Sequence, residues 1–275
     1  MILWALTSGT FLPRSVANAV ITIRINPEID LGPVTLAWHG LTIAVGILIG
    51  GLAAGRWARE RGLPTDPLYT VGALLAVGGI VGGRIFFILE NDPGGLLRPE
   101  ALFSGRGFTF DGGLILATAL IAGYVHRARL DLSYLDATAI GLPLGVAIGR
   151  IGDFINGEHY GDRSDFFLAV RNAHPDALTP NPALAYHNGG LYEVLLAASV
   201  FAALWPLRHR VRQPLSLVWL VLALFAGGRF LEFFLRSDSP ELALGLSNAQ
   251  WVSAGLLLVT GLGWGYTTRR RRFST

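Results

Sequence analysis

Seven long apolar runs constrain the fold of this sequence more than any other feature. They cover residues 34–55, 69–89, 111–125, 134–150, 191–207, 215–235 and 248–266. A run of about 20 apolar residues has the length of a helix that crosses the ~30 Å hydrocarbon core of a bilayer. The sequence therefore predicts an all-α, polytopic integral membrane protein with seven transmembrane helices, although the third and fifth runs are short for this length.

The composition supports a membrane protein. Hydrophobic residues make up 52% of the chain and charged residues only 15%, whereas soluble proteins carry about 25% charged residues. The 35 glycines suit membrane helices, because glycine lets helices approach closely. The chain has no cysteine, so any thiol chemistry must use a thiol that a substrate supplies.

The placement of arginine predicts the orientation. Twelve arginines follow the first, third, fifth and seventh apolar runs: Arg56, Arg59, Arg61, Arg127, Arg129, Arg208, Arg210, Arg212, Arg269, Arg270, Arg271 and Arg272. Seven crossings put all twelve on one side, which the positive-inside rule makes cytoplasmic. We therefore expect the N-terminus outside and the C-terminus in the cytoplasm. Topology and anionic membrane lipids then account for the net charge of +3, without nucleic acid as a partner.

The sequence shows no linker between domains. We expect an N-terminal extracytoplasmic segment over residues 1–33, a transmembrane domain over 34–266 and a basic cytoplasmic tail over 267–275. The polar, proline-containing insert 159–188 lies on the outer side in this topology and is predicted to form a small head. Residues 17–19 (Ala-Asn-Ala) resemble a signal-peptide cleavage site, but the start of the chain lacks positive charge, which favours an uncleaved segment.

Three arginines, Arg84, Arg150 and Arg229, lie inside or at the edge of apolar runs. Each costs at least ~2.5–3.5 kcal/mol at the centre of a membrane helix, so each should face the bundle interior or an aqueous cavity. A structural explanation is a set of ion pairs, Arg150–Asp153, Arg229–Glu232 and Arg84–Glu158. The other explanation is a binding site. Arginines that outnumber the buried acids can bind a phosphate or carboxylate, and the abundant phosphate of a bilayer is a lipid headgroup.

Three further polar residues each have two explanations. His39 in the first run is either a helix–helix contact or a chemical group. Asp111, before a glycine pair, is either an N-cap or part of a site. His187 lies with Tyr192 and Glu193 at the outer end of the fifth run, where anchoring at the membrane interface by Tyr192 is the simpler explanation.

Six motifs follow one another along residues 25–265: NPEIDLGPVTLAWHGL, GGRIFF, GRIGDFINGEHYG, YHNGGLYE, GGRFLEFFLR and LSNAQWVS. In this order and spacing they resemble the prolipoprotein diacylglyceryl transferase family. The third motif, residues 149–161, is similar to the family signature G-R-x-G-N-F-x-N-x-E-x-x-G. The family's seven spans with an outer N-terminus agree with the arginine pattern.

The resemblance implies an enzyme of the bacterial cytoplasmic (inner) membrane. Such enzymes transfer the diacylglyceryl group of phosphatidylglycerol to the lipobox cysteine of a prolipoprotein signal peptide and release glycerol phosphate. The implied partners are phosphatidylglycerol, that signal peptide and membrane lipids, and no cofactor or metal is implied. A free thiol has a pKa of ~8.5 and must lose its proton to attack, while the leaving phosphate needs cationic donors.

By resemblance, Arg150 and Arg229 hold the lipid phosphate. Glu158 keeps its position in the family signature, and Asp111 and His39, at positions where the sequence departs from the family, complete the candidate catalytic set. The candidate substrate-binding residues are the matching Arg84, Asn156, Gly161, Glu232 and Arg236, together with Asp153 and His187 at positions that depart from the family.

The sequence also departs from the family. Asp111 stands where the family has a catalytically important histidine, Asp153 where it has asparagine, and His39 where it has tyrosine. His187 opens a His-Asn-Gly-Gly run in place of H-P-x-Q. We hypothesise that Asp111 or His39 serves as the base. The alternatives are a catalytically altered or inactive lipid-binding paralogue and a transporter for an anionic solute.

Overall fold

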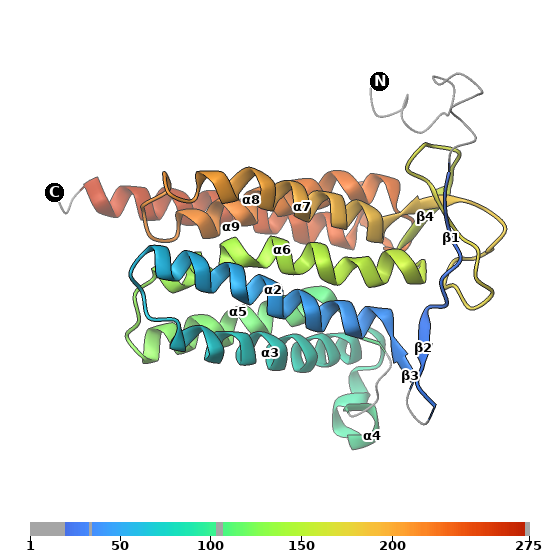
Figure 1. Ribbon diagram of the computed structural model, residues 1–275, viewed down its shortest axis with the longest axis horizontal. Helices are drawn as coiled ribbons and strands as arrows, with labels where there is room; N and C mark the ends of the chain where they lie inside the picture. The colour runs from blue at the N-terminus through green and yellow to red at the C-terminus, as the bar shows by residue number, and fades with distance from the viewer. Residues whose placement is uncertain (1–19, 33–34, 103–106, 273–275) are drawn as a thin grey trace.

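The computed structural model describes residues 20–32, 35–102 and 107–272, and it is mostly helical. Seven long helices follow one another along these residues: α2 (Trp38–Glu60), α3 (Asp66–Asn91), α5 (Phe110–Arg127), α6 (Ser133–Asn156), α7 (Gly189–Leu207), α8 (Ser216–Glu232) and α9 (Asn248–Arg272). Each coincides with one of the predicted apolar runs, and the helices extend along the long axis of the molecule (Figure 1).

Five of these helices are long and apolar enough to cross a membrane. They are α2, α3, α6, α7 and α8 together with the 3₁₀ turn η2 (Phe233–Leu235). Their most apolar windows have mean hydropathies between 1.4 and 2.0. The described residues therefore form a mostly helical membrane protein with five candidate membrane-spanning helices, and α5 and α9 are helices outside this set.

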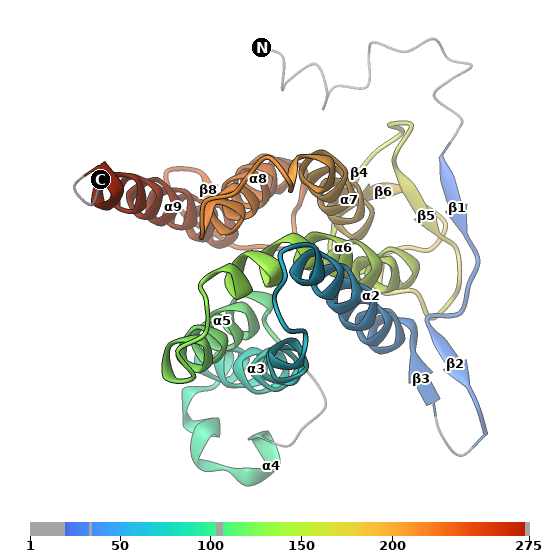
Figure 2. The same ribbon diagram turned by 60° about the vertical axis from the view of Figure 1, so that its left-hand side comes forward.

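Helix α6 occupies the middle of the bundle. It packs against α2 on one side and against α7 and α8 on the other, while α3 pairs with α5 and α8 pairs with α9. Figure 2 shows α6 between these groups. Residues that lie near the end of α6 can therefore contact α2, α7 and α8 at once.

Glycines let α2 and α6 touch along their backbones. A Cβ atom on Gly46 would lie 2.4 Å from the Gly145 carbonyl oxygen, and one on Gly141 would lie 2.3 Å from the Gly50 carbonyl oxygen. The two glycines on each helix are four residues apart, so they share one face. Farther along, a Cβ on Gly152 would lie 2.5 Å from the Cα of His39.

One end of the bundle carries short strands, which corrects the all-α prediction. The strands are β1 (Ile21–Ile23), β2 (Glu28–Asp30), β3 (Thr35–Ala37), β4 (Tyr160–Arg163), β5 (Val170–Asn172), β6 (Tyr186–Asn188), β7 (Glu241–Ala243) and β8 (Leu246–Ser247). One sheet has the order β1-β5-β6-β4, with β1 parallel to β5, and the pairs β2-β3 and β7-β8 are antiparallel. The insert between α6 and α7 thus forms a sheet, to which the segment before α2 adds one strand.

Two short helical segments lie between α3 and α5. They are η1 (Pro93–Leu97) and α4 (Pro99–Leu102). At the other end of the chain, α9 continues to Arg272, so most of the predicted basic tail belongs to this helix. The expected uncleaved segment and its residues 17–19 lie outside the described residues.

Two charged side chains, Asp136 and Glu60, hold the bundle end opposite the strands. Asp136 accepts hydrogen bonds from the amides of Leu215, Leu217 and Val218, at 2.7, 2.9 and 3.1 Å, at the start of α8. Glu60 at the end of α2 accepts two hydrogen bonds from Arg208, at 2.9 and 3.0 Å. These contacts tie α6 to α8 and α2 to the α7–α8 connection.

Replacing Gly46 by alanine should lower the free energy of unfolding by about 1–3 kcal/mol, because the new methyl group forces α2 and α6 apart. The matched control is Gly51→Ala on the same helix, since a Cβ there meets no atom within 4 Å. Thermal unfolding in detergent, followed by circular dichroism, measures both variants. Equal midpoints for the two variants would contradict the close helix contact.

Candidate active site

Charged side chains gather inside the bundle at the end that carries the strands. We define this charged cluster as Arg150, Asp153, Glu193, Arg229, Glu232 and Arg236. Helix α6 supplies the first two, α7 supplies Glu193, α8 supplies the next two, and Arg236 directly follows η2. All six side chains are nearly inaccessible to solvent. Buried charges of this kind are tolerated only when they are paired.

Glu193 is the centre of the charged cluster. One of its carboxylate oxygens pairs with Nε of Arg150, and the other pairs with Nη1 of Arg229. The second oxygen also accepts from Nη1 of Arg236 at 3.0 Å. Three guanidinium groups from three parts of the chain therefore converge on one carboxylate that is 1% exposed.

Reasoning from the sequence missed Glu193 as a site residue. The residue lies one turn inside an apolar helix, where an unpaired carboxylate would be costly. That cost was the available signal, because it implies a cationic partner from another helix.

The structure corrects the expectation that arginines outnumber the buried acids. Asp153, Glu193 and Glu232 match the three arginines of the charged cluster in number. The predicted pair Arg150–Asp153 is confirmed. For Arg229, the structure records a pair with Glu193, while Glu232 accepts from Arg236 at 3.2 Å.

Asp153 joins the charged cluster to helix α2. Its carboxylate is fully buried, and one oxygen accepts from Nη1 of Arg150. The other oxygen contacts Nδ1 of His39, in the first turn of α2. The His39 side chain is 40% exposed, in contrast to its partner.

A second histidine continues this network toward the strands. His159 Nε2 lies 3.8 Å from an Asp153 oxygen, and its Nδ1 lies 2.9 Å from an Asp238 oxygen. Asp238 also accepts from Nε of Arg236 at 2.8 Å. Burial alone would raise the pKa of Asp238, but the hydrogen bonds from His159 and Arg236 outweigh it and hold this pKa well below its usual range.

The other predicted site residues near the strands form two side-chain contacts. Asn156 donates to a Glu158 oxygen at 2.8 Å, and His187 Nδ1 lies 2.6 Å from the Tyr192 hydroxyl. Burial lowers the pKa of His187 below its ordinary value, and Asp162 opposes this shift. Gly161 lies so close to the end of η2 that a Cβ would sit 1.8 Å from the Leu235 carbonyl oxygen.

Two predicted residues lie on the α3–α5 pair. Arg84 donates to the carbonyl oxygens of Ala101 and Gly107, at 2.8 and 2.9 Å, and so holds the connection between the two helices. Asp111 lies in the first turn of α5, and its side chain is outside the described part of the structure.

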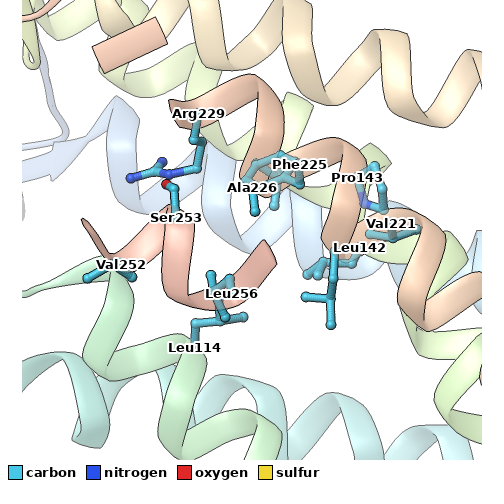
Figure 3. Close-up of a pocket in the computed structure, with 12 residues that line it drawn as sticks. Leu114, Leu142, Pro143, Val221, Phe225, Ala226, Arg229, Val252, Ser253 and Leu256 are labelled. Atoms are coloured by element: carbon cyan, nitrogen blue, oxygen red, sulfur yellow. The ribbon is translucent and has the colours of Figure 1, made fainter. Parts of the chain in front are cut away.

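An apolar groove runs from the charged cluster between four helices. Residues of α5, α6, α8 and α9 line it, and they include Leu114, Leu142, Val221, Phe225 and Leu256. Figure 3 shows Arg229 and Ser253 side by side at one end of the groove, with Leu142, Pro143 and Val221 at the other. The groove therefore combines an apolar lining with an arginine at one end.

One group of described residues has the chemistry of metal ligands. Ligand atoms of His39, Asp153 and Glu158 all lie within 4.8 Å of one another. Asp153, however, already binds Arg150 and His39, and a second imidazole lies nearby. The Arg150 guanidinium on Asp153 opposes the binding of a further cation, so we interpret the group as an ion-pair network.

Comparisons with known proteins identify the family of this chain. The model of the family "Prolipoprotein diacylglyceryl transferase" matches residues 28–266, a range that contains the whole charged cluster and His39. Proteins named "Phosphatidylglycerol--prolipoprotein diacylglyceryl transferase" are similar along most of their length. The one from Erythrobacter litoralis is 33% identical over 251 residues, which are 86% of this chain and 87% of that protein.

Two further relatives carry the same name. The protein of Sinorhizobium medicae is 32% identical over 255 residues, covering 84% of this chain and 88% of the relative. The protein of Agrobacterium fabrum is 30% identical over 267 residues, covering 89% of this chain and 92% of the relative. The family match and these relatives confirm the resemblance in the six motifs. The chain belongs to the prolipoprotein diacylglyceryl transferase family.

Proposed function

We propose that the protein transfers the diacylglyceryl group of phosphatidylglycerol to the lipobox cysteine of a prolipoprotein signal peptide and releases glycerol phosphate. The observation that carries this proposal is the convergence of Arg150 and Arg229 on Glu193, at the end of an apolar groove. The relatives in the same family are named for this reaction. Phosphate and acyl chains of one lipid would then bind at neighbouring places.

The lipid phosphate binds the two arginines. A guanidinium presents five N–H donors in a fixed fork, which suits both carboxylate and phosphate oxygens. Glu193 holds Arg150 and Arg229 in position before the lipid arrives. The acyl chains extend along the groove, away from the charged cluster.

The transfer of the diacylglyceryl group requires a thiolate as nucleophile and a stabilised leaving group. The cysteine sulfur attacks the glyceryl carbon that carries the phosphate, so an S–C bond forms as the C–O bond breaks. The electron pair of the broken bond stays on the phosphate, where the arginines stabilise the new charge. Asp111 and His39 are the two candidates for the group that takes the thiol proton.

The remaining predicted residues line the site. Asn156, Glu158 and Gly161 form its edge toward the strands, and Glu232 and Arg236 complete the charge balance around Glu193. Asp153, His187 and Arg84 belong to the same substrate-binding set. Arg84 contributes by ordering the connection between α3 and α5.

The protein lies in the bacterial cytoplasmic (inner) membrane, with all seven long helices spanning it. The arginine-rich connections follow α2, α5 and α7 and the end of α9, which supports a cytoplasmic position for this end of the bundle. The N-terminal segment, the head insert 159–188 and the charged cluster are then on the outer side. In this orientation the site binds signal peptides at the outer face of the cytoplasmic membrane.

A catalytically altered lipid-binding paralogue is the second candidate. It is favoured by Asp153, since this carboxylate neutralises part of the positive charge of Arg150. The names of the relatives favour the transferase, because the similarity covers more than four fifths of each chain.

Purified protein in detergent should convert phosphatidylglycerol and a lipobox peptide into a diacylglyceryl peptide and glycerol phosphate. Mass spectrometry of the peptide and an enzymatic assay of glycerol phosphate measure the two products. A peptide with serine in place of cysteine is the control and should gain no mass. Binding of the lipid by well-folded protein without release of glycerol phosphate would favour the paralogue.

Replacing Arg229 or Arg150 by lysine should lower the transfer rate about 10²–10³-fold, because a lysine ammonium lacks the forked donors that stabilise the leaving phosphate. The control is Arg98→Lys, since Arg98 is exposed and pairs with Asp92 outside the charged cluster. Initial rates at saturating lipid measure the effect. Near-normal rates in both site variants would contradict the phosphate clamp.

The variants Asp111→Asn and His39→Phe test the two candidate bases. The variant that lacks the base should fail to support growth of a bacterium that depends on this transferase, because the lipobox thiol would remain protonated. Growth assays with matched expression levels measure the outcome. Full growth with both variants would show that neither residue is needed.

A further inference from the structure

We propose that His39 and Asp153 act as a pair, in which His39 takes the proton of the substrate thiol and Asp153 positions the imidazole. This inference rests on the proposed transferase function and chooses between its two candidate bases. His39 is then a catalytic residue and Asp153 a positioning residue.

The fold brings the two residues together where the start of α2 meets the end of α6. His39 lies in the first turn of α2, and Asp153 lies in the last turn of α6. Between them, Gly152 has no side chain, and a Cβ there would lie 2.5 Å from the Cα of His39. The backbones therefore approach closely enough for Nδ1 of His39 to contact the Asp153 carboxylate.

The surroundings of Asp153 keep it ionised and in place. Arg150 binds one carboxylate oxygen, and the other oxygen faces His39. A carboxylate without a proton accepts a hydrogen bond, so it selects the imidazole tautomer with the proton on Nδ1. The other ring nitrogen, Nε2, then carries the lone pair that a general base needs.

The exposures of the two side chains fit these roles. The Asp153 side chain is 0% exposed, so it can reach a substrate only through a neighbour. The His39 side chain is 40% exposed, so a peptide thiol can approach its ring. A purely structural ion pair would be equally satisfied with both partners buried.

Arg150 connects this pair to the phosphate clamp. Its guanidinium binds Asp153 through Nη1 and Glu193 through Nε. Glu193 in turn binds Arg229, at the end of the lipid groove. Arg150 thus contacts both the residue that positions the base and the carboxylate that holds Arg229, so the base lies next to the phosphate clamp.

The proton and electron balance closes without any other reactant. The lone pair on Nε2 takes the proton of the S–H group, and the sulfur electron pair forms the S–C bond. The C–O bond to phosphate breaks, and its electron pair remains on the released glycerol phosphate. The imidazolium, stabilised by Asp153, finally gives its proton to water at the exposed edge of the ring.

The test compares a cysteine peptide with a selenocysteine peptide. A selenol is ionised at neutral pH, so it needs no base, whereas a thiol does. The variant His39→Gln should lose about 10²–10⁴-fold in transfer to the cysteine peptide. It should transfer to the selenocysteine peptide within about 10-fold of the unmodified protein. Asp153→Asn should show the same selective rescue with a smaller loss, because the imidazole remains but is less well oriented.

Controls separate this role from others. His174→Gln and Asp176→Asn change a similar pair in the head, whose side chains lie 3.7 Å apart, and should leave both rates unchanged. Arg229→Lys should impair both peptides equally, because its effect is on the leaving group. Circular dichroism checks that each variant is folded.

Four results would overturn the proposal. If the His39 variant lost the same transfer rate with both peptides, the pair would be structural. Normal transfer rates with both peptides would make the pair dispensable. Selective rescue of Asp111→Asn instead would make Asp111 the base. Loss of activity with a chelator and its return with zinc would make His39, Asp153 and Glu158 a metal site. No transfer by the unmodified protein to either peptide would refute the proposed function itself.

Discussion

The interaction of Glu193 with three arginines is the constraint on which the rest of the site depends. A carboxylate and three guanidinium groups buried among membrane helices would be prohibitively costly if they were separated. Pairing them requires α6, α7, α8 and the segment after η2 to meet at one place. The bundle therefore has little freedom at this end, and the same rigidity gives the arginines the fixed positions that phosphate binding demands.

The neighbouring elements follow from this meeting point. With α6 central, its final turn faces α7 and α8 on one side and α2 on the other (Figure 2). Asp153 binds His39 on the α2 side, while Arg150 binds Glu193 on the α7 side. One helical turn of α6 thus binds side chains of α2 and of α7, and the apolar groove begins beside the arginine on α8.

The helices and part of the site could be predicted from the sequence because both depend on local patterns. Apolar length marked all seven helices, and the spacing of three residues marked the pair Arg150–Asp153. The role of Glu193 could not be predicted in this way, because its partners lie 36 and 43 residues away or on the preceding long helix. The parallel pairing of β1 with β5 was missed for a similar reason: strands of three residues, far apart in the chain, carry no periodic signal.

The glycine contact between α2 and α6 also sets the register of the two helices. Gly46 and Gly50 fit opposite Gly145 and Gly141, so the helices can seat together in only one alignment. Turning α2 by one residue would rotate its side chains by about 100° and point His39 away from Asp153. The glycines of α2 and α6 thus set the alignment that brings His39 to Asp153.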